Sequence, residues 1–455
     1  MSRQRLAEIY DLAWPVLVAQ LATMGYGVID TMMTGRAGTD DLAAAGIGAA
    51  IYASVFVGLM GVLIAVSPTV AHLKGAERHG EIGEQVRQAM WLALVLAVMS
   101  ILVFRFPEPF IALSDPPPAV AEKVRAFLAI AAWGVPAGLA FRLFSSYTTA
   151  VSRPRIMMVL NLAGLALKVP LNYVFIFGHA GAPAMGAAGC ALATAIVSWI
   201  VCLLAWLRAA TAEEYRPHGV FTRWSWPRWH DQWRLLSLGV PIGGSFLVDV
   251  TSFTFMALFI ARLGAVNSAA HQIAANVAAV MYMLPLAMGN AVTVLVGQAL
   301  GAGRYPLARS TGITGISLAC AFGCTGAFLL AIGAHAVAAL YTPDPAVQSL
   351  AATLLLFAAG YHVFDAMQAV TVNALRGYKR AVVPLVVNVV GMWCLGLAGG
   401  YVLGLTPWVD LSFAGLATPL GVRGLWAGAI AGMALSTLAT LAYFLAVSAR
   451  GRTRT

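Results

Sequence analysis

Apolar residues form twelve long runs along the chain, and short polar segments separate them. Each run is long enough to cross about 30 Å of hydrocarbon as an α-helix, in which every backbone hydrogen bond is made within the segment. The pattern therefore predicts an all-α integral membrane protein with twelve transmembrane helices. The runs lie near residues 9–34, 46–72, 88–106, 124–146, 155–178, 185–208, 235–262, 270–297, 312–333, 347–371, 381–405 and 422–448.

The composition supports this prediction. Of the 455 residues, 60% are hydrophobic and only 10% are charged, whereas soluble domains are about a quarter charged. All five cysteines fall inside apolar runs, at no spacing typical of a disulfide framework or a metal site. No phosphate-binding loop, catalytic nucleophile motif or zinc motif is present in the sequence. We therefore expect a protein that is not an enzyme, that has no cofactor and that draws its energy from an ion gradient.

The positive residues predict the orientation in the membrane. Twelve spans place both termini on one side, so the loops form two alternating sets. One set, which includes Arg87 and Arg376, holds 20 of the 28 lysines and arginines, and the other set holds 6. Arg142 and Lys168 lie within spans. Because cytoplasmic loops are enriched in Lys and Arg, we expect both termini to be cytoplasmic, and membrane topology accounts for the net charge of +10.

The longest linker, residues 211–234, combines cations with aromatic rings. Such a mixture suits the headgroup layer, so this linker is predicted to be a cytoplasmic segment lying along the membrane lipid. Stacking on single-stranded nucleic acid uses the same residue types, but the flanking spans hold the linker against lipid, and no nucleic-acid partner is expected. The residues concerned are Arg216, Arg223, Arg228, Arg234, Trp224, Trp226, Trp229 and Trp233.

The two halves of the chain share a pattern. Pro15 corresponds to Pro241, and the segment 35–38 corresponds to 261–264, at the same offset of 226 residues. Six spans per repeat give the halves the same orientation, related by an axis along the membrane normal. The sequence therefore predicts two pseudo-symmetric six-helix lobes, residues 1–210 and 235–455, which face each other around a central cavity and expose it alternately to each side.

Only three of the 18 acidic residues, Asp30, Asp249 and Asp365, fall inside spans. A carboxylate at the centre of a transmembrane helix costs about 2.5–3.5 kcal/mol on insertion scales, and such residues mark ion or substrate pathways. A carboxylate in low dielectric takes up a proton or binds Na⁺ with the help of other oxygens. The alternative is that these acids only pack the helices together, satisfied by hydroxyls such as those of Thr251, Ser252 and Thr254.

Several motifs resemble those of the multidrug and toxic compound extrusion (MATE) family, in its NorM-like branch. The resemblance implies a secondary active multidrug efflux transporter that exports cationic amphipathic compounds by antiport with Na⁺ or H⁺. It further implies a monomer in a bacterial inner membrane. The motifs are Gly27-Val-Ile-Asp30-Thr-Met-Met-Thr-Gly35, Asp41-Leu-Ala-Ala44, Pro241-Ile242 through Asp249-Val-Thr251, Tyr361-His-Val-Phe-Asp365 and Leu375-Arg-Gly-Tyr-Lys379.

The resemblance implies a cation site in the second lobe formed by Asp249, Asp365, Tyr361 and Tyr282. The two carboxylates would hold Na⁺ if the protein is coupled to sodium. Tyr361 and Asp365 are four residues apart, so one helical face presents the ring and the carboxylate together. A ring face also attracts a cation.

In the first lobe the resemblance implies a proton or substrate switch at Asp30, with Asn172 nearby and Pro15 as a bending point. Relatives that bind a cation here carry an amide where this chain has Lys168. Lys168 could neutralise Asp30, which favours proton exchange over Na⁺ in this lobe. Two alternatives stay open: Lys168 could extend to the membrane interface, and Pro15 could mark the first turn of its helix.

Two further residues are implied to contact substrate: Gln272 in the eighth span and Asp344 in an outer loop. A second function remains open, that of a lipid-linked oligosaccharide flippase of the same larger superfamily. A flippase would need a basic cavity for pyrophosphate, and only Arg142 and Lys168 are predicted to be intramembrane cations. A membrane-embedded enzyme would need a nucleophile or metal constellation, and the sequence shows none.

Overall fold

The computed structural model describes residues 3–114, 116–409 and 419–450, and all of its elements are helical. Twelve described segments are long and apolar enough to cross a membrane; α2 and α3 form one of them, and α13, η2 and α14 form another. The predicted fold class is confirmed. The elements are α1 (Arg3–Ala37), α2 (Thr39–Ile64), α3 (Val66–Gly75), α4 (His79–Arg105), α5 (Glu108–Ser114), α6 (Pro118–Ala150), α7 (Arg155–Phe177), α8 (Ala187–Thr211), η1 (Glu213–His218), α9 (Trp229–Ala261), α10 (Ala265–Gly301), α11 (Tyr305–Tyr341), α12 (Pro345–Gly377), α13 (Val382–Asn388), η2 (Val389–Gly399), α14 (Gly400–Leu405) and α15 (Val422–Arg450).

Most helices extend beyond the apolar runs that predicted them. The run 347–371 lies within α12, which continues to Gly377, and the run 88–106 overlaps α4, which begins at His79 and ends at Arg105. Hydropathy marks only the part of a helix inside hydrocarbon, whereas backbone hydrogen bonding continues through the polar ends. As a result, the placement of Arg87 and Arg376 in loops is wrong, because both residues lie in helices.

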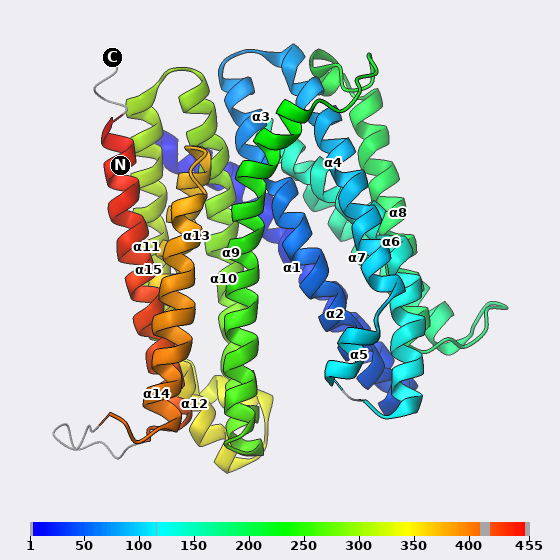
Figure 1. Cartoon of the computed structure of the whole chain (residues 1–455), viewed down its shortest axis with the longest axis vertical. Coiled ribbons are helices and arrows are strands. Elements are labelled where there is room, and N and C mark those ends of the chain that lie inside the picture. The colour runs from blue at the N-terminus through cyan, green and yellow to red at the C-terminus, as the bar shows by residue number, and fades with distance from the viewer. Residues whose placement is uncertain (1–2, 115, 410–418, 451–455) are drawn as a thin grey trace. The chain divides into compact units, whose positions relative to one another are not determined.

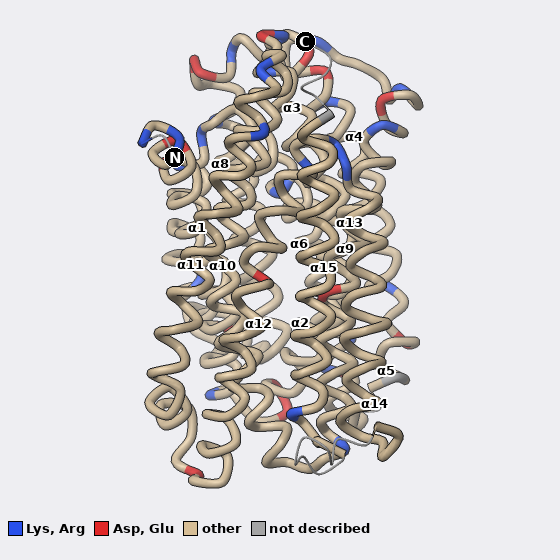
Figure 2. The backbone as a smooth tube through the Cα atoms, turned by 90° about the vertical axis from the view of Figure 1, so that its left-hand side faces the viewer, with Lys and Arg blue, Asp and Glu red and all other residues tan. Residues whose placement is uncertain are grey.

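Charged residues are concentrated toward the ends of the helices, and few lie along their middle parts (Figure 2). This distribution is what a hydrocarbon slab requires, because a charge at mid-helix is costly unless it is paired or functional. The few charges in the middle of helices are therefore the first candidates for a site.

The chain forms two compact units. The first unit is Trp14–Gly243, and the second unit combines Met1–Ala13 with Gly244–Thr455. Residues 451–455 of the second unit, and of the predicted second lobe, lie outside the described residues. The predicted lobe boundaries stay a prediction. The linker 211–234 belongs to the first unit by its contacts.

In the first unit, α6 is the central helix and packs against α2, α4 and α8 (Figure 1). Its side chains Leu128, Leu139, Leu143 and Phe144 are fully buried. Lipid tails are as apolar as leucine, so close van der Waals packing of these side chains, rather than exclusion from water, holds membrane helices together. Truncating one of them to alanine should cost about 2–5 kcal/mol, as in other close-packed cores.

In the second unit, α10, α11 and α12 pack against one another, and glycines allow α15 to approach η2 and α14 closely. A Cβ atom placed on Gly428 would lie 2.4 Å from the Cα of Gly400, and one on Gly424 would lie 2.6 Å from the Cα of Gly404. Only glycine fits at such contacts, and small residues spaced four apart are typical of close helix pairs in membranes. This packing fixes the position of the helical segment that begins after Asn388.

Candidate functional site

A cavity of about 490 Å³ lies within the second unit, between α9, α10, α12 and α13. All four residues of the predicted cation site line this cavity: Asp249 from α9, Tyr282 from α10, and Tyr361 and Asp365 from α12. The structure thus brings together side chains that are more than 100 residues apart in the sequence. A volume of this size suits a drug-sized ligand.

Asn388 contacts the carboxylate of Asp249. Its Nδ2 atom donates a hydrogen bond of 2.7 Å to Oδ1 of Asp249. Its own Oδ1 atom is buried and receives no hydrogen bond from any described residue. The buried amide oxygen and the carboxylate together offer acceptors for a proton or a cation.

The hydroxyls that could have satisfied Asp249 bond elsewhere. Thr251 and Thr254 donate to backbone carbonyls of α9, and Ser252 donates to the carbonyl of Met392. The predicted alternative that these hydroxyls satisfy Asp249 is therefore wrong, because Asn388 is its hydrogen-bond partner instead.

Asp365 has no hydrogen-bond or ion-pair partner among the residues that the structure describes. Tyr361, one helical turn earlier, is only 4% exposed, and its ring packs edge to face on Phe253 at 5.7 Å between centroids. The Tyr361 ring is therefore held in place, while the Asp365 carboxylate remains available to a ligand in the cavity.

Arg376 is a cavity residue that the sequence analysis missed. It is 5% exposed, donates from Nη1 to Oδ1 of Asn373 at 3.2 Å, and lies with its Cζ atom 5.0 Å from the ring centroid of Phe246. Asp365 and Arg376 are eleven residues apart on α12, a spacing that returns to the same helical face. This periodicity could have identified Arg376 if α12 had been extended past its apolar run.

The charges on the described lining of the cavity do not balance. Asp249, Asp365 and Arg376 are its charged residues, so with all three ionised the lining carries one net negative charge. Leaving a net charge buried is expensive, and one cation would neutralise it. Among the described residues, no three His, Cys, Asp or Glu side chains gather as a metal site. A bound Na⁺ would therefore use amide and phenol oxygens beside the carboxylates.

The remainder of the lining is largely apolar and aromatic. Phe246, Phe253 and Met433 accompany the two tyrosines around the carboxylates. Aromatic faces attract cations, and methionine adapts to ligands of different shape. The arrangement can accept an amphipathic cation, with its charge at the carboxylates and its apolar body against the rings.

The first unit holds a partly buried carboxylate, Asp30, which is already paired with a cation. Oδ1 of Asp30 accepts a hydrogen bond of 2.8 Å from Nδ2 of Asn172 and lies 3.0 Å from Nζ of Lys168. The Lys168 side chain is 0% exposed and also donates to Oγ1 of Thr194. The alternative in which Lys168 extends to the interface is therefore wrong. The predicted grouping of Asp30, Asn172 and Lys168 is present in the structure.

The internal repeat relates these two sites only in part. The offset of 226 residues relates Asp249 to Thr23, and an offset of 227 relates Asn388 to Asn161. Thr23 and Asn161 do contact each other, at 3.5 Å between Oγ1 and Oδ1. The first unit therefore keeps the polar pair of the second unit without its carboxylate, and Asp30 lies elsewhere along α1.

The remaining predicted residues lie outside these two groups. Pro15 lies inside α1, which begins at Arg3, so the alternative of a helix start is wrong, whereas bending at Pro15 stays a prediction. Gln272 is exposed on α10 and does not line the cavity. Asp344 is exposed and caps α12, because its Oδ1 accepts a hydrogen bond of 2.9 Å from the backbone N–H of Ala346. The substrate contacts predicted for Gln272 and Asp344 stay predictions.

The fold and these residues define a class: a multi-pass, all-α membrane protein with partly buried carboxylates in both units. The family model described as MatE matches residues 15–174 and 241–402. The chain belongs to the MatE family, whose members are transporters and not enzymes, and the predicted resemblance is confirmed.

Curated relatives match nearly the whole chain. It is 41% identical to "Probable multidrug resistance protein NorM" of Aromatoleum aromaticum over 431 residues, covering 94% of this chain and 92% of the relative. It is 38% identical to "Multidrug resistance protein PmpM" of Pseudomonas aeruginosa, covering 95% and 89%. It is 36% identical to "Multidrug resistance protein NorM" of Vibrio cholerae, covering 96% and 94%. These relatives place the chain in the NorM-like branch.

Solved structures share the fold. A eukaryotic MATE transporter, AtDTX14, superposes with a TM-score of 0.86 at 16% identity, covering 99% of both chains. An outward-facing multidrug resistance MATE transporter gives a TM-score of 0.87 at 16% identity, covering 98% of this chain and 96% of that one. At this identity the likeness supports the helical fold and says nothing about ligands.

Proposed function

We propose that this protein is a secondary active multidrug efflux transporter that exports cationic amphipathic compounds in exchange for Na⁺ or H⁺. The single observation that carries the proposal is the charge balance of the second-unit cavity. Asp249 and Asp365 exceed Arg376 by one negative charge in a lining that is otherwise apolar, aromatic or neutral and polar. One bound cation would neutralise this lining, so the coupling ion and the cationic drug compete for the same site.

Competition of two cations for one unbalanced negative charge is the physical basis of the proposed antiport. When a proton or Na⁺ occupies the carboxylates, a cationic drug loses the charge that attracts it, and the drug is released. When the drug leaves toward the outer side and an ion enters, the site is reset. The names of the relatives, which describe multidrug resistance proteins, support drugs as the exported compounds.

The first-unit group takes a different part in this proposal. Because Lys168 lies 3.0 Å from Asp30, that carboxylate has a resident counter-ion and does not require Na⁺. We propose that Asp30 responds to protonation, which would free Lys168 and weaken the contact with Asn172. The protein would function as a monomer in a bacterial inner membrane, with both termini cytoplasmic as the distribution of Lys and Arg indicates.

A flippase for lipid-linked oligosaccharides remains the second candidate. It would need positive charge to hold a pyrophosphate, yet the cavity lining is net negative. The structure therefore favours a cationic substrate over an anionic one.

Efflux from proteoliposomes tests the proposal. Purified protein is reconstituted with a fluorescent cationic drug inside the vesicles, and release is followed under an imposed Na⁺ gradient and then under a pH gradient alone. We expect at least one gradient to accelerate efflux, and excess tetraphenylphosphonium to inhibit it. Efflux that responds to neither gradient, or inhibition by a lipid-linked precursor but not by tetraphenylphosphonium, would overturn the proposal.

A further inference from the structure

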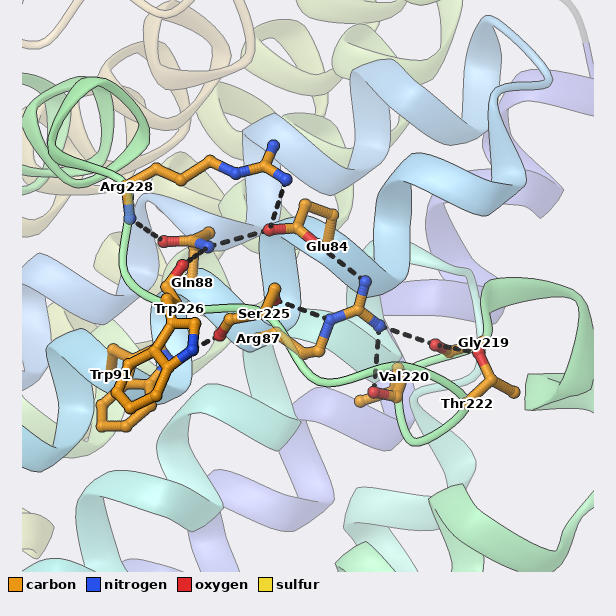
Figure 3. Close-up of polar contacts among 10 residues, drawn as sticks. All are labelled: Glu84, Arg87, Gln88, Trp91, Gly219, Val220, Thr222, Ser225, Trp226 and Arg228. Carbon is orange, nitrogen blue, oxygen red and sulfur yellow. Dashed lines mark hydrogen bonds and ion pairs between the residues drawn. The ribbon is translucent and has the colours of Figure 1, made fainter.

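The linker segment 219–234 runs along the polar half of α4. Side chains of α4 form hydrogen bonds with backbone groups of this segment (Figure 3). Arg87 donates from Nη1 to the carbonyls of Gly219 and Val220, at 2.7 and 3.1 Å, and from Nε to Oγ of Ser225 at 3.0 Å. Its Nη2 pairs with Glu84 at 2.7 Å. We refer to Glu84, Arg87 and Gln88 as the α4 clamp.

Gln88 completes the α4 clamp. It is fully buried, donates to the carbonyl of Trp226 at 2.9 Å, and accepts from the backbone N–H of Arg228 at 2.9 Å. The Nε2 atom of Gln232 donates to the backbone carbonyl of Gln88 at 2.8 Å. Polar backbone groups of the linker thus face α4, and the position of the segment is fixed.

The same segment presents indole rings away from the protein. The side chains of Trp224, Trp226, Trp229 and Trp233 are 74%, 72%, 74% and 59% exposed. Trp91 of α4 joins them: its ring lies 5.5 Å from that of Trp224 and 6.2 Å from that of Trp226, and its Nε1 donates to the carbonyl of Ser225. Burying one indole covers about 150–250 Å², so four exposed rings leave a large apolar face that water does not favour.

Trp91 also fixes the depth of this face in the membrane. The part of α4 before Trp91 contains the α4 clamp, whereas residues 92–104 contain no charged side chain. The change from polar to apolar sequence places the edge of the hydrocarbon near Trp91. The indoles that pack on Trp91 therefore lie at the headgroup level, where tryptophan is enriched in membrane proteins.

The charges of the segment complement an anionic surface. Residues 219–234 contain three arginines and one acidic residue, Asp231. Arg228 lies 4.0 Å from Glu84, whereas Arg223 and Arg234 are exposed and form no ion pair with any residue that the structure describes. An arginine near an anionic membrane surface contributes about 1 kcal/mol of attraction. Two unpaired guanidinium groups beside four indoles match a layer of acidic phosphates above hydrocarbon.

We propose that segment 219–234 is a binding surface for anionic phospholipid headgroups. Arg223 and Arg234 contact the lipid phosphates, the four indoles lie at the hydrocarbon edge, and the α4 clamp holds the surface rigidly on the first unit. The inference is independent of the transport function, because it rests on residues outside both carboxylate sites.

Quenching of tryptophan fluorescence tests the proposal. The full-length protein is reconstituted in lipid nanodiscs that contain equal fractions of brominated phosphatidylglycerol or brominated phosphatidylcholine. We expect the wild type to be quenched more by the brominated phosphatidylglycerol, and this preference to fall at high salt. The double variant Arg223→Gln with Arg234→Gln should lose the preference and remain quenched by both lipids, since its indoles are unchanged.

A matched control replaces two exposed arginines of other loops, Arg304→Gln with Arg380→Gln, and should keep the wild-type preference. Replacing Trp224, Trp226, Trp229 and Trp233 by phenylalanine should lower the quenched amplitude. Equal quenching of the wild type by the two lipids would overturn the proposal, as would a preference that survives in the Arg223 and Arg234 variant. If the face docks a protein instead, the wild type will show no lipid preference.

Discussion

Asn388 donates a hydrogen bond of 2.7 Å to Asp249, and its own side-chain oxygen receives none from the described residues. The amide therefore orients the carboxylate and at the same time adds a second acceptor beside it. This relationship joins α9 to the residue that immediately precedes η2, a π-helical stretch. Such π-helical segments occur frequently at functional sites in helical proteins.

Arg376 should set the affinity of the cavity for cations. Replacing it by glutamine removes a positive charge from the lining, and the Coulomb attraction for a monovalent cation rises. We expect tetraphenylphosphonium to bind more tightly to Arg376→Gln, on the order of tenfold, while Arg376→Lys stays near the wild type. Titration of the purified protein measures both affinities. Weaker binding by the glutamine variant would contradict the charge balance.

The ion pair between Lys168 and Asp30 should contribute to the stability of the first unit. Lys168→Met leaves the partly buried Asp30 without its counter-ion, and removing one member of a buried pair costs at most about 3–5 kcal/mol. Adding Asp30→Asn removes the remaining charge, so the double variant should recover much of the lost melting temperature. Thermal unfolding in detergent compares the variants. If Lys168→Met has the same melting temperature as the wild type, the ion pair does not contribute this free energy to stability.

His218 should make η1 and the helix ends around it in the first unit sensitive to acid. Burial lowers its pKa from 6.5 to about 4, with smaller Coulombic effects of His79 and Lys74, and its Nδ1 atom is hydrogen-bonded to the Tyr147 hydroxyl at 2.6 Å. The unfolded chain therefore binds a proton at a higher pH than the folded chain does. This contribution to stability is complete above about pH 6.5 and declines as the pH falls toward 4.

Melting temperatures between pH 7.5 and 4.5 test this prediction. The wild type should lose stability over that range, and His218→Gln, which cannot titrate, should lose less. The exposed His335 of α11 offers a control, because His335→Gln leaves His218 and its neighbours unchanged. An identical pH dependence in wild type and His218→Gln would refute the assignment.

The α4 clamp should hold the linker against proteolysis. Arg87→Gln removes three hydrogen bonds and an ion pair that fix the segment 219–225. We expect faster tryptic cleavage after Arg223 in this variant. Arg78→Gln, which breaks only an exposed pair with Glu81, serves as the control. Unchanged cleavage in Arg87→Gln would show that other contacts hold the linker.

Much of this fold could be predicted because local stretches of sequence determine the membrane-spanning helices. Hydrophobic runs of more than 18 residues can only be helices in a membrane, so the number of spans follows from the sequence. The carboxylates Asp30, Asp249 and Asp365 stood out because charge is rare there. The helix ends could not be predicted, because beyond the hydrocarbon a helix continues on backbone hydrogen bonds that leave no apolar signal.

The partners of the carboxylates were harder to predict. The contact between Lys168 and Asp30 could be anticipated because both are charged residues within apolar runs. Asn388 and Arg376 were missed for different reasons. A single asparagine in an apolar run has no distinguishing pattern, and Arg376 lies just past a run, where a cation normally marks a loop. Their distance from Asp249 depends on how α12 and α13 pack against α9, which no local pattern encodes.

In the proposed mechanism, Asp249 and Asp365 bind one exchangeable cation between them. The most direct test is proton- or Na⁺-driven drug efflux by reconstituted Asp365→Asn, compared with the wild type and with Asp40→Asn, which alters an exposed acid at the start of α2. With equal protein in the vesicles, we expect Asp365→Asn to lose gradient-driven efflux and Asp40→Asn to retain it. Undiminished, gradient-dependent efflux by Asp365→Asn would contradict a role for Asp365 in cation exchange.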